Sequence, residues 1–290
     1  MAVIIDGKKA SGEILRFLQL MVADIKLKHN IAPTLAVILV GDDPASKVYV
    51  SKKEEMAKKI GFNSLMINLP DGTSQEEIAE KIEELNQNDD VNAILVQLPL
   101  PDYLDSHSLI NGISPMKDVD GFTPYNAGLL ATGKESVVPC TALGIMKLHE
   151  EYNIQLAGKN VTIVGRSNIV GKPLAHLMMA KNATVTVAHS KTENLEEHTL
   201  NADILVCATG KAHLITADMV KDGAVVIDVG ITRGEDGKLT GDVDYENVKE
   251  KASFITPVPG GVGPMTIAML AYNTYKLFAI QKAFPEGSKA

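Results

Sequence analysis

The sequence predicts an α/β protein with two domains, each built on a parallel sheet, and three observations support this prediction. Short apolar runs alternate with stretches of helical period through most of the 290 residues. These runs are rich in Val and Ile, which is typical of strands covered on both faces. A stretch rich in Gly, Pro and Asn, residues 112–139, divides the runs into two sets. Strands that alternate with helices in this way form parallel sheets with crossover connections.

The first set of elements occupies residues 1 to about 118. One helix is expected over 10–29, followed by a helix over 46–62 and another over 75–88. Asp43 suits the N-cap of the 46–62 helix, Pro44 its first position and Gly61 its end. The strands are expected in the three apolar runs TLAVILVG (34–41), NSLMINL (63–69) and NAILVQLPL (92–100).

The second set follows the 112–139 segment and begins with a helix over 141–153. Its strands are expected in NVTIVGRS (160–167), ATVTVAHS (183–190), ADILVCATG (202–210) and AVVIDVGI (224–231), with a turn at EDGK (235–238). The chain closes with PVPGGVGPMT (257–266) and an apolar helix from 265 to about 283. We expect this helix to return to the first domain, because the second set is already complete. The predicted domains are therefore 1–118 plus 268–290, and 119–267.

Composition excludes several classes of protein. The net charge of −8 argues against a nucleic-acid partner, which needs a basic surface. No apolar run approaches the roughly 20 residues that a bilayer requires, and the N-terminus lacks the features of a signal peptide. Two cysteines, Cys140 and Cys207, make no disulfide framework, so a cytoplasmic location is expected. The seven histidines are scattered without metal-ligand spacing, and no metal is expected.

One lysine occupies an unusual position in the 46–62 helix. At about 100° per residue, Tyr49, Met56, Ala57 and Ile60 form a stripe that should be buried, and Lys53 falls inside it. A lysine held among apolar groups has a lowered pKa, which makes its amine useful as an acid or base near neutral pH. The alternative is a lysine whose stem packs while its charged end reaches water.

A strand, a glycine turn and a helix follow one another at NVTIVGRSNIVGKPLAHLMMA, the order that a dinucleotide-binding turn requires. Gly165 and Gly171 are its glycines, and Ser167 stands where the standard G-x-G-x-x-G pattern has its second glycine. The next strand ends at Ser190 without the carboxylate that favours NAD. Together with Arg166 beside the turn, this favours NADP; the alternative for Arg166 is an ordinary surface position at a helix start.

Seven segments occur in an order that closely resembles the bifunctional methylenetetrahydrofolate dehydrogenase/cyclohydrolase family, over nearly the whole chain. They are YVSKK (49–53), ILVQLPLP (94–101), KDVDGF (117–122), GRSNIVGKP (165–173), DVGI (228–231), GDVDY (241–245) and PGGVGPMTI (259–267). The resemblance implies oxidation of 5,10-methylenetetrahydrofolate with NADP, then hydrolysis of the methenyl product to 10-formyltetrahydrofolate. It also implies a Rossmann-like second domain, a homodimer and a small-molecule folate substrate that lies in a cleft.

The resemblance also assigns roles to individual residues. Lys53 matches the catalytic lysine, Gln97 its hydrogen-bonding partner, Tyr49 a tyrosine that stacks on the folate and Asp120 the carboxylate that binds the pterin. Gln97 is equally plausible as a strand-end cap, Tyr49 as a core aromatic, and Asp118 is easily confused with Asp120. The other substrate contacts implied are Leu98, Pro99, Gly260, Gly261, Val262 and Pro264, although GGVG (260–263) also suits a plain turn. The NADP contacts implied are Gly165, Arg166, Ser167, Ser190, Ile231 and Thr141, the last also a good helix N-cap.

Two positions depart from the family's common pattern. Ala142 follows Thr141 where a proline is common, and Thr123 follows Phe122 where a histidine is common. Neither position carries acid–base chemistry, so both activities are still expected. Two other hypotheses are a nucleotide-binding scaffold without catalysis and a dehydrogenase with little cyclohydrolase activity. The presence of Lys53, Gln97 and Asp120 argues against both.

Overall fold

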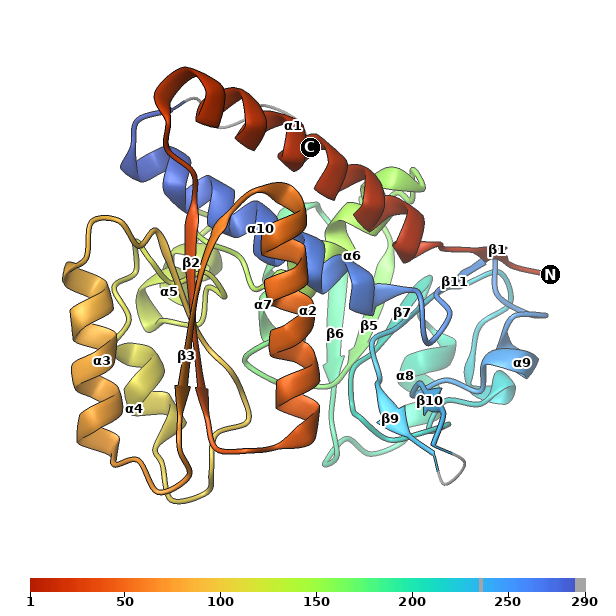
Figure 1. Cartoon of the computed structure of the whole chain (residues 1–290). Coiled ribbons are helices and arrows are strands. Elements are labelled where there is room, and N and C mark those ends of the chain that lie inside the picture. The colour runs from red at the N-terminus through yellow and green to blue at the C-terminus, as the bar shows by residue number, and fades with distance from the viewer. Residues whose placement is uncertain (235–236, 285–290) are drawn as a thin grey trace. The chain divides into compact units, whose positions relative to one another are not determined.

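The computed structural model describes residues 1–234 and 237–284 of the chain (Figure 1). The chain forms two compact units. One, here called the three-stranded unit, consists of Gly12–Leu129, Glu135–Val138 and Ile267–Ala290. The other, the six-stranded unit, consists of Met1–Ser11, Leu130–Lys134 and Pro139–Thr266.

The three-stranded unit is built on a parallel sheet of order β3-β2-β4, with β2 at Thr34–Val40, β3 at Asn63–Leu69 and β4 at Ala93–Val96. Alternate side chains of β2 point to opposite faces. Ala36, Ile38 and Val40 pack in one cluster with Ile78 and Leu109. Both faces of β2 are covered, which is why its apolar run is nearly unbroken. The helices that lie wholly or mostly in this unit are α1 (Gly7–His29), α2 (Pro44–Ile60), α3 (Gln75–Gln87), α4 (Ser106–Asn111) and α5 (Pro124–Ala131).

The six-stranded unit contains a parallel sheet of order β1-β11-β8-β7-β5-β6. Its central strands β5, β7 and β8 are buried, and Val164, Leu205, Val226 and Ile255 lie in one cluster. The strands are β1 (Val3–Ile4), β5 (Asn160–Val164), β6 (Thr184–Ala188), β7 (Ile204–Cys207), β8 (Val225–Asp228) and β11 (Phe254–Ile255). The helices are α6 (Cys140–Glu151), α7 (Gly171–Ala180), α8 (Leu195–Leu200), the 3₁₀ turn η1 (Ala217–Met219) and α9 (Tyr245–Val248). The strands β9 (Thr232–Arg233) and β10 (Leu239–Thr240) form a separate antiparallel pair.

The predicted α/β class with parallel sheets is confirmed, and the differences lie at edges and ends. Strands β1 and β11 were not predicted, because two-residue strands leave no pattern in the sequence. The 183–190 run was expected to be covered on both faces, but β6 is an edge strand and most of its residues are exposed. Only Ala93–Val96 of the 92–100 run is a strand. Of the predicted turn at 235–238, residues 235 and 236 lie outside the described residues.

The last helix of the described part of the chain is the long helix α10, Val262–Gln281. It begins three residues before the predicted start at 265, and Pro264 lies in its first turn, where a proline is tolerated. From Ile267 onward the helix belongs to the three-stranded unit, which confirms that it returns to the first domain. Asn273 of this helix is buried and donates to the carbonyl oxygens of Val119 and Val138, both at 2.9 Å.

The N-terminus belongs to the six-stranded unit. Val3 and Ile4 pair with Phe254 and Ile255 at the edge of the sheet. The predicted domains grouped these first residues with the three-stranded sheet instead. In the described part of the chain, no helix is both long and apolar enough to span a membrane.

Candidate active site

Helix α2 carries Lys53, and the predicted capping residues start and end this helix. The Asp43 carboxylate accepts a hydrogen bond from the Ser46 N–H at 2.7 Å, and Pro44 is the first helical residue. Gly61 ends the helix in the left-handed conformation, with φ 88°. Met56 and Ile60 are buried, as the helical period predicts. The helix therefore has one fixed face, and the position of Lys53 on it follows from the sequence.

Lys53 contacts a residue that lies far away in the sequence. Its Nζ donates a hydrogen bond to Oε1 of Gln97, and the two atoms are 2.8 Å apart. The Lys53 side chain is half-buried and Gln97 is buried. Gln97 directly follows β4, at the carboxyl end of the parallel sheet, where open α/β sheets bind their ligands.

The orientation of the Gln97 amide is set by a second contact. Its Nε2 donates to the carbonyl oxygen of Leu98 at 2.5 Å, which leaves Oε1 to accept from Lys53. Gln97 is thus more than a strand-end cap, because its oxygen directs the lysine amine. Leu98 and Pro99 continue the chain through a cis peptide bond, and Pro99 is exposed at this edge of the sheet.

Tyr49 lies one turn before Lys53, and its ring is not part of the core. The residue is 39% exposed, whereas the next residue, Val50, is buried. The expected buried position of Tyr49 is therefore wrong, because the core under α2 does not extend to the Tyr49 side of the helix. An exposed ring next to a half-buried amine is available to stack on a flat ligand.

Two neighbouring aspartates of the KDVDGF segment have different environments. Asp118 is buried and accepts hydrogen bonds from the Phe122 N–H, the Thr123 N–H and the Asn126 amide at 2.8–3.1 Å. These bonds occupy both oxygens and hold the start of α5, so Asp118 is structural. Asp120 is half-exposed. Of the two carboxylates, Asp120 is the one suited to a ligand.

Two other residues of this segment are also structural. Lys117 is buried, and its Nζ donates to the carbonyl oxygens of Leu85, Asn86 and Asn88, where α3 ends. Burial lowers the pKa of this amine. Thr123, where the family commonly has a histidine, is buried at the start of α5, with its hydroxyl 3.4 Å from the Asn126 N–H. The departure at this position is therefore accommodated by a local capping contact.

In the six-stranded unit, the glycine turn after β5 is shaped by close backbone approach. Gly165 has φ 129°, and a side-chain carbon there would lie 2.3 Å from the carbonyl oxygen of Ala208. A carbon on Gly171 would lie 2.0 Å from the Gly165 carbonyl oxygen. Both positions therefore require glycine. The helix that follows, α7, begins at Gly171, and its first N–H groups lie at the carboxyl end of the sheet.

Ser167, which replaces the usual second glycine, has a structural contact of its own. Its Oγ accepts from the N–H groups of Val170 and Gly171, at 3.1 and 3.4 Å. Arg166 and Ser190 are both exposed, after β5 and β6 respectively, on neighbouring strands of the sheet. A guanidinium and a hydroxyl on adjacent strand ends suit a phosphate group. The closely packed glycine turn, with these exposed groups beside it, therefore fits a dinucleotide.

Ile231 and Thr141, the predicted nicotinamide contacts, differ in their surroundings within the six-stranded unit. Ile231 is 46% exposed, just beyond β8, at the same edge of the sheet as the glycine turn. Thr141 does not cap its helix, because α6 begins at Cys140 and Pro139 is its N-cap residue. The Thr141 hydroxyl instead lies 3.1 Å from that of Thr266. Both cysteines, Cys140 and Cys207, are buried, which favours packing over nucleophilic chemistry.

The GGVG segment is a tightly packed turn that leads into α10. A side-chain carbon on Gly261 would lie 2.7 Å from the Pro257 carbonyl oxygen, and Gly260 has φ 115°. Gly261 and Val262 are buried, while Gly260 and Pro264 are half-exposed. Gly260 and Gly261 are therefore needed by the turn itself, and Gly260, Gly263 and Pro264 have surface to offer a ligand.

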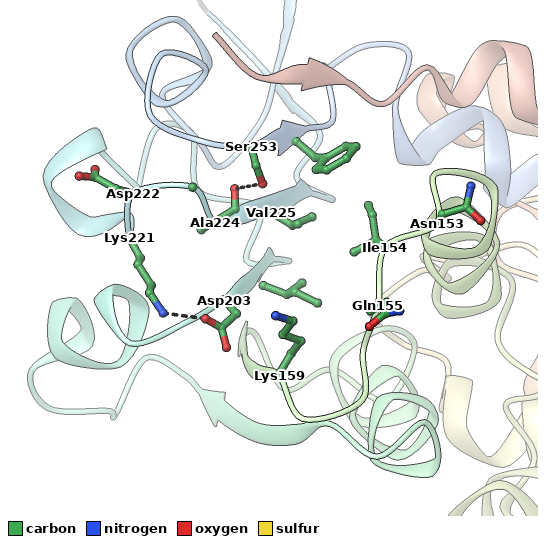
Figure 2. Close-up of a pocket in the computed structure, with 13 residues that line it drawn as sticks. Asn153, Ile154, Gln155, Lys159, Asp203, Lys221, Asp222, Ala224, Val225 and Ser253 are labelled. Atoms are coloured by element: carbon green, nitrogen blue, oxygen red, sulfur yellow. Dashed lines mark hydrogen bonds and ion pairs between the residues drawn. The ribbon is translucent and has the colours of Figure 1, made fainter.

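A cavity of about 280 Å³ elsewhere in the six-stranded unit contains none of the predicted site residues. Figure 2 shows Lys159, Lys221 and Asp203 around it. It lies at the amino ends of β7 and β8, opposite the edge that carries the glycine turn. Ligands of open α/β sheets bind at the carboxyl ends, so this cavity is not the active site. Among the described residues, no cluster of His, Cys, Asp and Glu could hold a metal ion.

Sequence reasoning gave no role to two buried carboxylates of the six-stranded unit, Asp228 and Asp242. Both occur in motifs that the sequence analysis quoted, DVGI and GDVDY. The available signal was the pairing of each aspartate with a glycine, at Gly230 and Gly241, which indicates closely packed backbone around each carboxylate.

Comparison with known proteins identifies the family. Residues 5–120 match the family model described as "Tetrahydrofolate dehydrogenase/cyclohydrolase, catalytic domain". Residues 139–282 match the model described as "Tetrahydrofolate dehydrogenase/cyclohydrolase, NAD(P)-binding domain". A curated relative, the "Bifunctional protein FolD" of Streptococcus thermophilus, is 54% identical over 276 residues, which are 95% of this chain and 97% of the relative.

Solved structures agree with this result. The bifunctional FolD methylenetetrahydrofolate dehydrogenase/cyclohydrolase of Campylobacter jejuni has a TM-score of 0.94 and 48% identity, over 96% of this chain and 98% of that one. The enzyme of Trypanosoma brucei, solved with NADP cofactor and an inhibitor, has a TM-score of 0.92 and 36% identity, over 96% and 98% of the two chains. This chain therefore belongs to the tetrahydrofolate dehydrogenase/cyclohydrolase family and contains both its catalytic and its NAD(P)-binding domain.

Proposed function

We propose that this chain oxidises 5,10-methylenetetrahydrofolate to the methenyl form with NADP and then hydrolyses the product to 10-formyltetrahydrofolate. The observation that carries this proposal is the hydrogen bond between Lys53 Nζ and Gln97 Oε1, 2.8 Å long, at the carboxyl end of the three-stranded sheet. A scaffold without catalysis has no need to direct an amine in this way. Membership of the family and the presence of both domains support the two linked activities.

Hydrolysis is assigned to Lys53 as general base and then general acid. The methenyl carbon carries positive charge, which favours the neutral form of a nearby amine. Lys53 donates one N–H to Gln97, and in its neutral form the amine can accept a proton from water. The water oxygen bonds to the methenyl carbon. The proton held on Lys53 then passes to the ring nitrogen as its bond to that carbon breaks. The hydroxyl on the carbon releases its remaining proton to solvent as it becomes the formyl carbonyl, which stays on the other nitrogen.

Tyr49 and Asp120 are assigned to binding of the folate rather than to proton transfer. The exposed Tyr49 ring offers a face for stacking, one helical turn from the amine. The half-exposed Asp120 carboxylate can accept paired N–H bonds from the amino-pyrimidine edge of the pterin. Leu98, Pro99, Gly260, Gly261, Val262 and Pro264 are proposed as further contacts. The buried state of Gly261 and Val262 limits any contact they make to backbone atoms.

The oxidation step needs a hydride acceptor, which NADP supplies when it is bound. Gly165, Ser167 and the start of α7 are proposed to hold its pyrophosphate, because the first N–H groups of α7 lie at this turn. Arg166 and Ser190 are proposed to bind the 2′-phosphate. Ile231 and Thr141 are proposed to lie beside the nicotinamide.

We further propose a cytoplasmic homodimer with no nucleic-acid or membrane partner. The edge strand β6 supports the dimer, because its backbone groups and Val187, 36% exposed, are open to a second copy. We propose that residues 1–118 and 268–290 form the folate-binding domain and that residues 119–267 form the NADP-binding domain. The N-terminal strand β1 is an exception in the structure, because it pairs with the six-stranded sheet. Sedimentation of the purified chain tests the dimer, and a monomer at micromolar concentration would contradict it.

An absorbance assay tests the two activities together. Methylenetetrahydrofolate is supplied with NADP or with NAD, and the reduced nicotinamide and methenyl signals are recorded over time. We expect reduction of NADP in preference to NAD, followed by decay of the methenyl signal. A methenyl signal that accumulates and decays only at the enzyme-free rate would indicate a dehydrogenase without cyclohydrolase activity. Absence of both signals would refute the proposal.

A further inference from the structure

Asp228 and Asp242 are buried at the carboxyl end of the six-stranded sheet, close to the predicted nicotinamide contact Ile231. Asp228 is the last residue of β8, and Asp242 follows β10 by two residues. In the described part of the chain, neither carboxylate takes part in a salt bridge. Buried carboxylates without a cation are rare, because desolvation disfavours their charge. Their surroundings therefore require an explanation.

Asp228 ties both ends of the β9–β10 pair to the end of β8. Its Oδ1 accepts hydrogen bonds from the Gly230 N–H and the Asp242 N–H, both at 2.9 Å. Its Oδ2 accepts from the Val243 N–H at 3.0 Å. Gly241 is needed for this contact, because a side-chain carbon there would lie 1.9 Å from Oδ2. One carboxylate thus holds the chain before β9 and after β10.

Asp242 holds a second turn, the one that follows β7. Its Oδ2 accepts from the Thr209 N–H at 2.6 Å, the Thr209 hydroxyl at 2.9 Å and the Gly210 N–H at 3.3 Å. The carboxylate lies against Gly230, where a side-chain carbon would stand 2.2 Å from Asp242 Oδ1. The Thr232 hydroxyl also donates to the Gly210 carbonyl oxygen at 3.2 Å. The turns after β7 and β8 are therefore joined through Asp242.

Burial disfavours the charged form of the Asp228 carboxylate, as its pKa shows. Burial raises the pKa of Asp228 to about 6, although three N–H bonds act to lower it. Burial, with Asp228 and Asp242 nearby, also raises the pKa of the Cys207 thiol well above its ordinary value. On the hairpin side, His213 Nε2 lies 2.9 Å from the Thr240 hydroxyl. Two buried carboxylates whose hydrogen bonds come only from N–H and O–H groups of turns have a role in geometry.

We propose that Asp228 and Asp242 are positioning residues for the nicotinamide half of the cofactor site. They hold the Thr209–Gly210 and Gly230–Ile231 turns in one fixed arrangement at the carboxyl ends of β7 and β8. A dinucleotide that enters at the Gly165 turn extends along this edge of the sheet, so these turns set the plane and depth of its second half. The inference rests on the proposed function and on the assignment of Ile231 to the nicotinamide.

Substitutions at Asp242 test the role, with dehydrogenase and cyclohydrolase activities measured separately on each variant. We expect Asp242→Ala to lower the dehydrogenase kcat by about 10- to 100-fold, because small misplacement of reacting groups has effects of this size. Hydrolysis of methenyltetrahydrofolate supplied directly is expected to stay within about twofold of wild type, since it needs no hydride acceptor. Asp242→Asn is expected to recover part of the lost rate, because its amide oxygen still accepts from the Thr209–Gly210 turn.

A matched control lies at the opposite edge of the same sheet. Asp203 accepts from the Asn160 N–H at 2.9 Å and pairs with Lys221 at 2.6 Å, as Figure 2 shows for the Lys221 contact. Asp203→Asn is therefore expected to lower stability without changing the ratio of the two activities. If Asp242→Ala does not fold, Thr209→Val removes a single hydroxyl donor to Asp242. A smaller but still selective loss of dehydrogenase activity is expected from that variant.

Two results would overturn the positioning role. One is an unchanged dehydrogenase rate in folded Asp242→Ala or Thr209→Val. The other is an equal fall of both activities that follows the fraction of unfolded protein, as a purely structural residue would give. These results differ from failure of the proposed function itself, in which wild-type protein lacks the dehydrogenase activity before any substitution is made.

Discussion

Replacement of Lys53 by methionine is the most direct perturbation of the proposed chemistry. Methionine keeps an unbranched apolar stem in the half-buried position but has no proton to give or take. General acid–base catalysis contributes about 10²- to 10⁴-fold, so the hydrolysis rate should fall by that factor. This corresponds to about 3–5 kcal/mol of transition-state stabilisation, at 1.36 kcal/mol for each tenfold change.

The effect on stability should be smaller than the effect on rate. Lys53→Met removes the donor to Oε1 of Gln97, which is buried in the wild-type protein. A buried acceptor left without its partner costs about 1–3 kcal/mol, and a water that enters the space lowers this figure. The protein should therefore stay folded, and the loss of hydrolysis should not follow from unfolding.

The assay follows the decay of supplied methenyltetrahydrofolate, with the enzyme-free rate subtracted. Lys52→Met is the matched control, since Lys52 is the preceding residue of α2 and is exposed. It carries the same chemical change without the contact to Gln97. Folate and NADP binding should persist in both variants. Hydrolysis at the wild-type rate in Lys53→Met, or an equal loss in Lys52→Met, would refute the role of Lys53.

Three further predictions concern the six-stranded unit. Arg166→Ala should raise the KM for NADP by about tenfold or more while the KM for NAD changes little, since a charge-assisted hydrogen bond is worth about 1.5–3 kcal/mol; equal changes would exclude contact with the 2′-phosphate. Gly165→Ala should lower the free energy of unfolding by about 3 kcal/mol or more and abolish NADP binding, because of overlap with Ala208. The matched control is Gly158→Ala, at a residue with φ 75° and open space around it. This variant should lower the free energy of unfolding by only about 1–2 kcal/mol, and denaturant titration measures both variants. Asp228 binds its proton more tightly when folded, since its pKa rises from 3.8 to about 6, so its contribution to stability falls as pH rises from about 4 to 7. The free energy of unfolding of wild type relative to Asp228→Asn should therefore fall by about 3 kcal/mol over that range, and a pH-independent difference would contradict the raised pKa.

The fold was predictable where a segment carries its own pattern. The limits of α2 follow from Asp43, Pro44 and Gly61, which act on neighbouring backbone groups. The buried strand β2 follows from a continuous apolar run. Edge positions were not predictable in this way. The run 183–190 resembles the other strands, yet most of β6 is exposed because it lies at the edge of the sheet, where it pairs with β5 on one side.

For the candidate site, too, the sequence predicted some features and only the structure shows others. The resemblance placed Lys53, Gln97 and the Gly165 turn in named roles, and these roles remain predictions. Tyr49 was expected to be buried from the helical period, but it is exposed. The period predicts which way a side chain points from the helix, and it does not predict how far the core extends along that helix. Asp118 and Asp120 are two residues apart and chemically identical. Only the structure shows that Asp118 is buried and holds the start of α5, whereas Asp120 is half-exposed.

The sequence by itself determined the α/β class, the capped helix that carries Lys53 and the family to which the chain belongs. These depend on local spacing and on motifs that can be read along the chain. Only the tertiary structure decided that Lys53 meets Gln97, 44 residues away, and that Asp228 and Asp242 join the turns after β7 and β8. The physical reason is that such contacts depend on strand order and register, which bring distant backbone groups within hydrogen-bond distance.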